Sequence, residues 1–335
     1  MKASLDGQWV RLPPEGKILH EQSGYGRGDA EGFRLSPAEA LYLVHRGKLT
    51  VEGFGFESLL LHFTREENFL RKYLVYRDLR ERGYVVQTGP HDFRVFRRGQ
   101  KPGSGESQYL VRVLSERDLI RFEILVQEVT AARNMRKQYV LAVVDDEDEL
   151  TYYEIKLPVL PPVGEGNVPA GVEAAVCGRS VLVQAGPDSD LREKGFGTKL
   201  DETRMLLSPT ESSFLMEKGA LRLVREGSPL TRDQFVGALA GSDQELGEKI
   251  SVFTDLRNLG YVPRTGYKFG HHFRVYSGGK THSEMLVHAV ARGAALPMST
   301  ISRSVRMAHS VKKKMFFGSV HDQGIQYIEF GRIKL

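Results

Sequence analysis

The sequence repeats itself, and this duplication limits the folds that the chain can adopt. Residues 35–49, LSPAEALYLVHRGKL, match residues 207–221, LSPTESSFLMEKGAL, at seven of fifteen positions. Residues 78–89, DLRERGYVVQTG, match residues 255–266, DLRNLGYVPRTG, at eight of twelve. The offsets, 207 − 35 = 172 and 255 − 78 = 177, agree closely. We infer two fused copies of about 165 residues each.

Both copies predict the same order of helices and strands. The motif SPxE at residues 36–39 and 208–211 is a capping box with proline at the first helical position. A longer amphipathic helix follows, then short strands such as FRVF and FRVY, and a last helix near residues 299–311. This order predicts a mixed α/β fold with α+β elements, in which helices pack on a small sheet. The Pro- and Gly-rich junction at residues 157–171 is typical of a linker.

Composition excludes several classes of protein. The 41% hydrophobic and 27% charged residues are ordinary for a globular protein, and the net charge of +5 is compatible with a nucleic-acid partner. The single cysteine, Cys177, excludes an intramolecular disulfide and a cysteine-based zinc cluster. No signal peptide and no run of about 18 apolar residues is present, so we expect a cytoplasmic protein without a membrane partner.

The two copies differ at side chains that can carry chemistry. Aligning HSEMLV with ESQYLV pairs His282 with Glu106, and FRVY with FRVF pairs Tyr276 with Phe96. Lys313 aligns with another lysine, Lys137, in copy one. Each residue taken singly has a simpler interpretation as a packing or surface side chain. Copy one lacks both the tyrosine and the histidine, although the motifs around them persist. We therefore favour a functional role for the three residues in copy two.

These motifs resemble the archaeal tRNA-splicing endonucleases. The similarity covers both copies through LSPxE, DLRxxGYVxxTG, KFGxxFRVY, HSEMLV and RMAHSVKKKMFF, with His272 where the family motif usually has Asp. The resemblance implies a metal-free catalytic triad of Tyr276, His282 and Lys313, without a cofactor. It also implies the homodimeric class, in which an inactive copy is fused to an active one, and cleavage of precursor tRNA at intron–exon junctions in a bulge-helix-bulge RNA.

The resemblance divides each copy into a small N-terminal α/β subdomain and a nuclease subdomain with a mixed sheet like that of restriction endonucleases. The expected boundaries are 1–68 and 69–157 (inactive) for copy one, 158–166 for the linker, and 167–243 and 244–335 (catalytic) for copy two.

The expected chemistry is consistent with these side chains. Metal-free RNA cleavage needs a base for the 2′-hydroxyl, an acid for the leaving 5′-oxygen and a cation for the phosphorane, and gives 2′,3′-cyclic phosphate and 5′-hydroxyl ends. Imidazole, which ordinarily titrates near pH 6.5, suits the acid. A phenol ordinarily titrates near pH 10, so tyrosine needs a neighbouring ammonium to act as a base or else only positions the hydroxyl.

Two further groups of residues are candidates for recognition. The segment 303–314 holds five Lys and Arg and no acid, and suits phosphates. The resemblance assigns Arg306 and Arg332 to a clamp on an unpaired base, with Arg303 as a further RNA contact. It also implies that an acidic loop joins two chains into a homodimer: Asp145, Asp146, Glu147, Asp148 and Glu149. A solvated turn is the simpler interpretation of that run.

Three alternatives belong to other classes. A metal-dependent restriction-like nuclease would use a Glu-x-Lys motif such as Glu154-Ile155-Lys156. A zinc site would draw on four histidines that lack cysteine partners and HxxxH spacing: His271, His272, His282 and His288. The third alternative is a non-catalytic RNA-binding scaffold.

Overall fold

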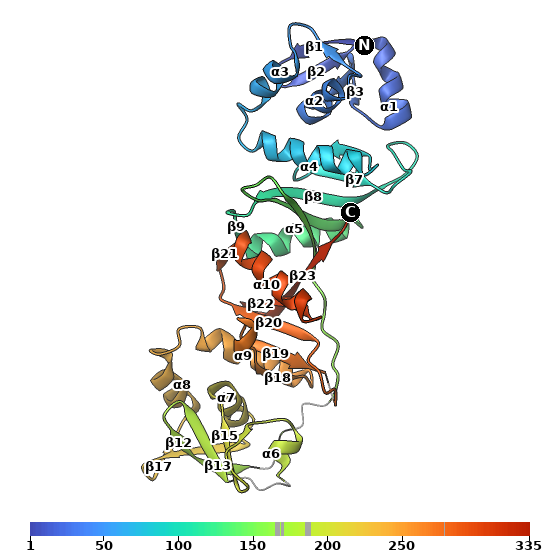
Figure 1. Cartoon of the computed structure of the whole chain (residues 1–335). Helices are drawn as coiled ribbons and strands as arrows, with labels where there is room; N and C mark the ends of the chain where they lie inside the picture. Colours follow the sequence, from blue (N-terminus) through green and yellow to red (C-terminus); the bar gives the residue numbers. More distant parts are fainter. Residues whose placement is uncertain (165–167, 169–170, 185–188, 278) are drawn as a thin grey trace. The chain divides into compact units, whose positions relative to one another are not determined.

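The computed structural model describes residues 1–164, 168, 171–184, 189–277 and 279–335 (Figure 1). The chain forms two units. Unit 1 contains Met1–Lys156, Ala295–Ser302 and Phe330–Leu335, and unit 2 contains Leu157–Ala294 and Arg303–Glu329. Copy one therefore builds most of unit 1 and copy two builds unit 2. Residues 165–166 of the expected linker lie outside the described part of the chain.

Unit 1 has a small N-terminal sheet with the strand order β3-β4-β2-β1-β5, followed by α4 and the strands β11-β10-β8-β7-β6. In chain order its elements from copy one are β1 (Lys2–Asp6), β2 (Trp9–Leu12), η1 (Pro14–Gly16), α1 (Lys17–Ser23), β3 (Arg27–Asp29), β4 (Gly32–Leu35), α2 (Pro37–His45), β5 (Thr50–Val51), α3 (Phe56–Phe63), α4 (Phe69–Glu81), β6 (Val86–Thr88), β7 (Phe93–Phe96), β8 (Ser107–Ser115), β9 (Leu119–Arg121), α5 (Phe122–Asn134), β10 (Gln138–Val144) and β11 (Leu150–Lys156).

Copy two repeats this plan, with the N-terminal strand order β14-β15-β13-β12-β16-β17 and the later order β18-β19-β20-β22-β23. Its elements are β12 (Val172–Cys177), β13 (Ser180–Gln184), α6 (Asp190–Glu193), β14 (Thr198–Lys199), β15 (Arg204–Leu207), α7 (Pro209–Glu217), β16 (Leu221–Arg225), β17 (Ser228–Leu230), α8 (Arg232–Ala240), α9 (Leu246–Asn258), β18 (Val262–Thr265), η2 (Tyr267–Phe269), β19 (Phe273–Tyr276), β20 (Met285–Val290), β21 (Ala295–Pro297), α10 (Met298–Ser310), β22 (Lys314–His321) and β23 (Gly324–Ile333).

The strand ladders of the two copies have the same register. In the parallel pair β8–β10, Tyr109 lies opposite Gln138, and in β20–β22, Met285 lies opposite Lys314. Both partners are displaced by the same number of residues, since 285 − 109 and 314 − 138 are both 176. The mixed α/β fold with two copies is therefore confirmed, down to the alignment that pairs Glu106 with His282.

The predicted capping boxes are confirmed, and each glutamate has a second task. Glu39 accepts a hydrogen bond from the Ser36 amide (2.8 Å) and another from the Gly26 amide (2.9 Å). Glu211 likewise accepts from the Ser208 amide (2.9 Å) and from the Gly197 amide (2.8 Å). Each buried carboxylate thus ties the start of α2 or α7 to a preceding turn.

That turn explains why Gly-Tyr-Gly at residues 24–26 is echoed by Gly-Phe-Gly at residues 195–197. Gly26 has φ +72° and Gly197 has φ +65°, the left-handed region that favours glycine. The aromatic ring between the glycines packs under a guanidinium of the long helix. Arg80 lies 3.8 Å from the Tyr25 ring centroid, and Arg257 lies 3.6 Å from that of Phe196. The N-terminal subdomain is thereby anchored to α4 or α9.

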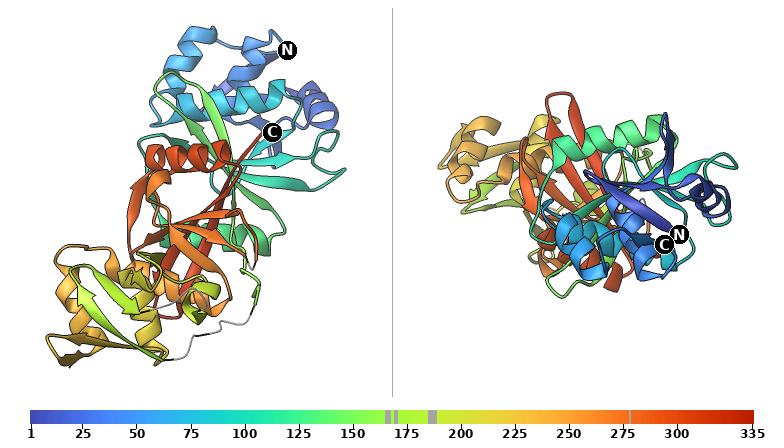
Figure 2. Two further views of the ribbon diagram at one scale, coloured as in Figure 1. Left: turned by 60° about the horizontal axis from the view of Figure 1, so that its bottom comes forward. Right: turned by 90° about the horizontal axis from the view of Figure 1, so that it is seen from above.

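In copy one, α4 lies between the N-terminal strands β1–β3 and the later strands β7–β8 (Figure 1). The core of unit 1 includes Val75, Val111 and the last residue of the chain, Leu335. Figure 2 shows this C-terminal end among the elements of copy one. In the described residues, no helix is long and apolar enough to cross a membrane.

Candidate active site

Copy two forms an open cleft of about 1470 Å³ in unit 2. The segment that joins β19 to β20 lines it with His282, and the connection between α10 and β22 lines it with Lys313. Parallel strands begin at the same edge of a sheet, so the ladder between β20 and β22 brings the residues that precede both strands together. Strand order alone therefore places an imidazole and an ammonium group at one edge.

Lys313 is held by the chain next to His282. Its Nζ donates to the carbonyl oxygen of Ser283 at 2.6 Å, and its backbone amide donates to the carbonyl oxygen of Ala308 at 2.9 Å. Lys313 is half-buried, whereas His282 is exposed. The ammonium group is thus fixed while the imidazole faces the solvent in the cleft.

Tyr276 ends β19, at the other end of the loop that carries His282. Its ring is half-buried, and the guanidinium carbon of Arg274 lies 5.8 Å from the ring centroid. Tyr276 is not among the described residues that line the cleft. The structure therefore brings two of the three expected catalytic residues into one cleft, with Tyr276 at the start of the connecting loop.

At the equivalent place in copy one, the lysine is paired with a carboxylate. Lys137 Nζ lies 3.1 Å from Glu106 Oε2, and this contact lowers the pKa of the Glu106 carboxyl through the hydrogen bond first and the charge second. Phe96, the partner of Tyr276, is only 6% exposed. The hollow beside Glu106 measures about 380 Å³. Copy one thus has the lysine but neutralises it with a carboxylate.

A network in the loop before β20 was not predicted. The Glu284 carboxylate accepts hydrogen bonds from the Ser277 hydroxyl and the Lys280 ammonium, and these two, Lys280 first, lower the pKa of Glu284. The three side chains bracket His282 in the sequence. Copy one has Gln108 in place of Glu284, and this difference is the signal that sequence comparison could have used.

The expected RNA contacts lie on two elements. Arg303 and Arg306 are exposed on α10, in the part that belongs to unit 2. Arg332 is exposed on β23, in the part that belongs to unit 1. The roles of these three residues stay predictions.

The acidic run forms an ordered turn between β10 and β11. Asp145 Oδ1 accepts from the backbone amides of Glu147 (3.0 Å) and Glu149 (2.9 Å), and the Asp146 carboxylate pairs with Arg117. The four residues 146–149 are exposed. The run is therefore a preformed acidic turn, and its role in joining two chains stays a prediction.

The alternative sites find less support in the geometry. His271, His272 and His288 do cluster, but His282 lines the separate cleft described above. In the Glu-x-Lys motif, Lys156 Nζ pairs with Glu154 Oε2 at 2.8 Å.

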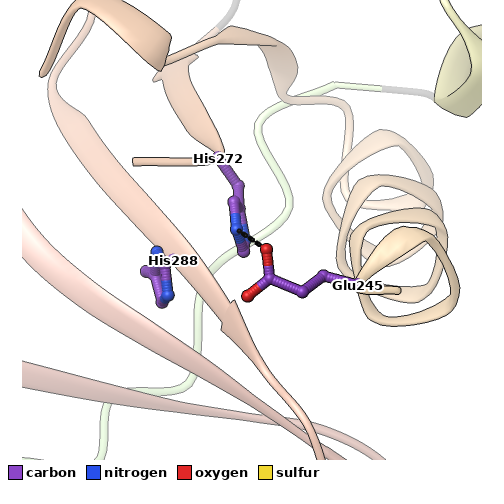
Figure 3. Close-up of side chains that lie close together, drawn as sticks. All are labelled: Glu245, His272 and His288. Atoms are coloured by element: carbon purple, nitrogen blue, oxygen red, sulfur yellow. Dashed lines mark hydrogen bonds and ion pairs between the residues drawn. The ribbon is translucent and has the colours of Figure 1, made fainter. Parts of the chain in front are cut away.

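One group in the described residues has the composition of a metal site. Ligand atoms of Glu245, His272 and His288 lie within 4.8 Å of one another (Figure 3). However, the Ala289 amide donates to His272 Nδ1 at 3.0 Å. A neutral imidazole has one lone pair, so His272 Nε2 carries the proton and faces Glu245 Oε2 at 3.2 Å. His272 therefore offers no lone pair to a metal in this arrangement.

The fold and the cleft define a class: a duplicated α/β protein whose second copy carries a basic cleft. Residues 1–60 and 172–236 match the family model described as tRNA intron endonuclease, N-terminal domain. Residues 69–152 and 246–327 match the one described as tRNA intron endonuclease, catalytic C-terminal domain.

Full-length relatives agree with these matches. The tRNA-splicing endonuclease of Methanococcoides burtonii is 40% identical over 348 residues, 97% of this chain and 98% of that protein. The tRNA-splicing endonuclease of Methanosarcina barkeri is 38% identical, and the match covers the whole of both chains. That of Natronomonas pharaonis is 33% identical, and the match covers 99% of each chain. The chain therefore belongs to the tRNA intron endonuclease family, whose members are endoribonucleases. The resemblance seen in the sequence motifs is confirmed.

Proposed function

We propose that this protein cleaves precursor tRNA at intron–exon junctions without a metal ion, leaving 2′,3′-cyclic phosphate and 5′-hydroxyl ends. The observation that carries the proposal is the difference between the two equivalent edges. Copy two presents His282 and Lys313 in an open cleft, whereas copy one pairs the equivalent lysine with a carboxylate in the Glu106–Lys137 ion pair. One copy is thus suited to anionic RNA and the other is neutralised.

The positions of the side chains support a role for each of them in this reaction. His282 is exposed in the cleft and protonates the leaving 5′-oxygen. Lys313, fixed by the Ser283 carbonyl, stabilises the extra negative charge on the phosphorane. Tyr276, at the other end of the loop, acts on the attacking 2′-hydroxyl as a base or as a positioning group.

Recognition rests on α10 and β23 in the same proposal. Arg306 and Arg332 stack on an unpaired base of the bulge, and Arg303 contacts phosphate. Planar guanidinium groups suit stacking, which is worth about 1–3 kcal/mol per base. Arg306→Lys keeps the charge but loses the plane, so it should impair binding of bulged RNA as much as Arg306→Ala. If lysine fully replaces arginine, the contact is with phosphate alone.

We further propose that the acidic turn at residues 145–149 contacts a basic surface of a second chain, which makes the active protein a homodimer. Its four exposed acids on a rigid turn support this role.

A single-turnover assay on a bulge-helix-bulge RNA tests the reaction. We expect cleavage in EDTA, a cyclic phosphate at the 3′ end, and no cutting when the scissile nucleotide carries a 2′-deoxyribose. A requirement for Mg²⁺ together with a 5′-phosphate product would instead indicate a restriction-like nuclease. Binding of the RNA without any cleavage would indicate a scaffold.

A further inference from the structure

The two copies use different side chains to hold the same backbone amide. In copy one, Asp92 Oδ2 accepts a hydrogen bond from the Val113 amide of β8 at 2.7 Å. In copy two, His272 Nδ1 accepts from the Ala289 amide of β20 at 3.0 Å. The positions correspond, because 272 − 92 is 180, as for FRVF and FRVY, and 289 − 113 is 176. A histidine thus replaces a carboxylate as the acceptor.

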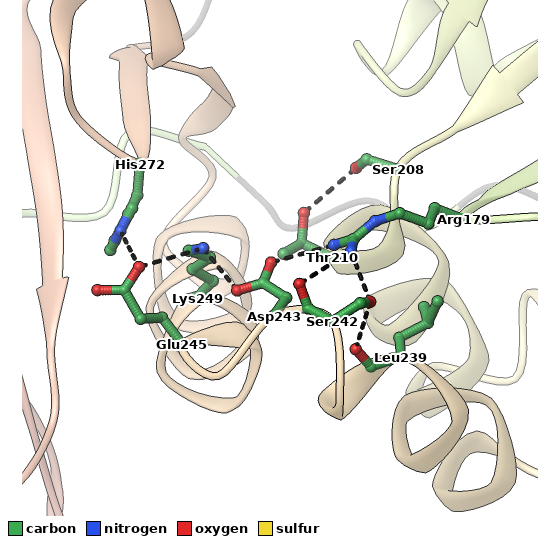
Figure 4. Close-up of polar contacts among 9 residues, drawn as sticks. All are labelled: Arg179, Ser208, Thr210, Leu239, Ser242, Asp243, Glu245, Lys249 and His272. Carbon is green, nitrogen blue, oxygen red and sulfur yellow. Dashed lines mark hydrogen bonds and ion pairs between the residues drawn. The ribbon is translucent and has the colours of Figure 1, made fainter.

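The surrounding charges are rearranged to suit the histidine. In copy one, Lys72 Nζ lies 3.4 Å from Asp92 and Asn68 precedes α4. In copy two, the corresponding lysine, Lys249, lies 3.5 Å from Glu245, which occupies the position of Asn68. Figure 4 shows the resulting series of contacts from His272 through Glu245 and Lys249 to Asp243.

The two acceptors respond differently to acid. A carboxyl group keeps an acceptor oxygen whether or not it is protonated. An imidazole that gains a second proton becomes a donor at both nitrogens, so Nδ1–H would face the Ala289 N–H. The hydrogen bond from the Ala289 amide to His272, which adds to the ladders of β20 with β19 and β22, therefore exists only while His272 is neutral.

We propose that His272 is a positioning residue that holds β20 as a neutral acceptor, and that its protonation releases this strand in copy two while β8 of copy one stays held. β20 directly follows the segment that contains His282 and Ser283. The inference concerns the strand itself and does not depend on RNA cleavage.

The groups that face His272 favour its neutral form on balance. Its side chain is 11% exposed, and the ring of His288 stacks on it with centroids 4.1 Å apart. Burial, then His288 and Lys249, lower the pKa of His272 to about 4, against the opposing effect of Glu245. Burial likewise lowers the pKa of His271 to about 4 and lowers that of His288.

Acid should weaken the hold of His272 on β20. Because the folded pKa is below the ordinary value of 6.5, the stabilising effect of neutral His272 is complete above pH 6.5 and is lost as the pH falls toward 4. At pH 5, opening that exposes His272 should be favoured on the order of 30-fold relative to pH 7.5.

Amide hydrogen exchange, corrected for the intrinsic rate at each pH, tests this in the unmodified chain. We expect the peptide that contains Ala289 to lose protection on the order of 30-fold between pH 7.5 and pH 5, and the peptide that contains Val113 to change much less. An equal response of both peptides would overturn the proposal.

Two matched variants assign the effect to His272. Glu245→Asn/His272→Asp transplants the side chains of copy one and should remove most of the acid response of β20. Asn68→Glu/Asp92→His should confer an acid response on β8. An unchanged response of β20 in the first variant would show that His272 is not the cause. Protection of β20 by Zn²⁺ at pH 7.5, lost in the first variant, would make the cluster a metal site and overturn the proposal.

Discussion

At the scale of single residues, the two copies share a scaffold and differ in what they place at one edge of it. Lysine is present in both, as Lys137 and Lys313, but its neighbour is Glu106 in one and His282 in the other. A carboxylate beside the lysine cancels its charge, whereas an imidazole can donate a proton beside it. A single difference, Glu106 in place of His282, thus replaces a proton donor beside the lysine with an ion pair.

His282→Ala should slow cleavage of bulged RNA by roughly 100- to 10,000-fold, the usual loss when a general acid is removed. A substrate with sulfur in place of the leaving 5′-oxygen needs little protonation, so single-turnover rates of variant and parent on it should be similar. Glu106→Ala is the matched control and should leave the rate intact. Equal impairment of His282→Ala on both substrates would show that His282 is not the acid.

At the scale of elements, the loop between β19 and β20 connects Tyr276 to His282. Glu284 ties the two ends of this loop together through Ser277 and Lys280. Its pKa is lowered by these contacts, so the carboxylate stays charged and the network persists at neutral pH. Since its side chain is 43% exposed, the network shapes the loop more than it stabilises the fold.

Glu284→Gln should therefore slow cleavage while leaving the melting temperature nearly unchanged. A displacement of about 1 Å at a reacting group can cost about 100-fold, so we expect a rate loss of roughly 10- to 100-fold. Gln108→Glu makes the reverse change in copy one and should have no effect on the rate. A single-turnover rate within twofold of the parent for Glu284→Gln would exclude this role.

At the scale of the whole molecule, unit 1 is not built from copy one alone. In unit 1, β21 pairs antiparallel with β9, placing Leu296 opposite Ile120, and the Met298 amide donates to the Asp118 carbonyl at 2.9 Å. Arg82 donates to the backbone oxygen of Leu335 at 3.0 Å. Unit 1 therefore includes two segments from the end of the chain, Ala295–Ser302 and Phe330–Leu335. We expect copy one expressed without these segments to be poorly folded.

The acidic turn belongs to the same scale. Replacing residues 145–149 with Ser and Gly should weaken self-association, most strongly at low salt, because the variant loses a charge attraction to the second chain that high salt already screens in the parent. Sedimentation at low protein concentration measures this change. Neutralising exposed acids elsewhere in unit 1, Glu52, Glu57 and Glu67, should leave the dimer intact. An unchanged dimer after replacement of the turn would make it an ordinary solvated turn.

The sequence by itself determined the duplication, the capping boxes, the later strands and the alignment of Glu106 with His282, because these depend on local patterns and on comparison within one chain. The short strands of the N-terminal sheets, such as β3 and β14, escaped prediction, since a strand of two or three residues leaves too short a pattern. The same internal comparison pairs His272 with Asp92.

Only the tertiary structure decided how those side chains are used. The Lys313–Ser283 contact and the amide held by His272 join residues through the order and register of strands. The Glu284 network depends on how the loop between β19 and β20 folds back on itself. Which nitrogen of His272 carries the proton depends on where the Ala289 amide points, and that direction is set by the pairing of β20 with its neighbours. Hydrogen-bond direction is a property of the assembled sheet, so no pattern along the chain specifies it.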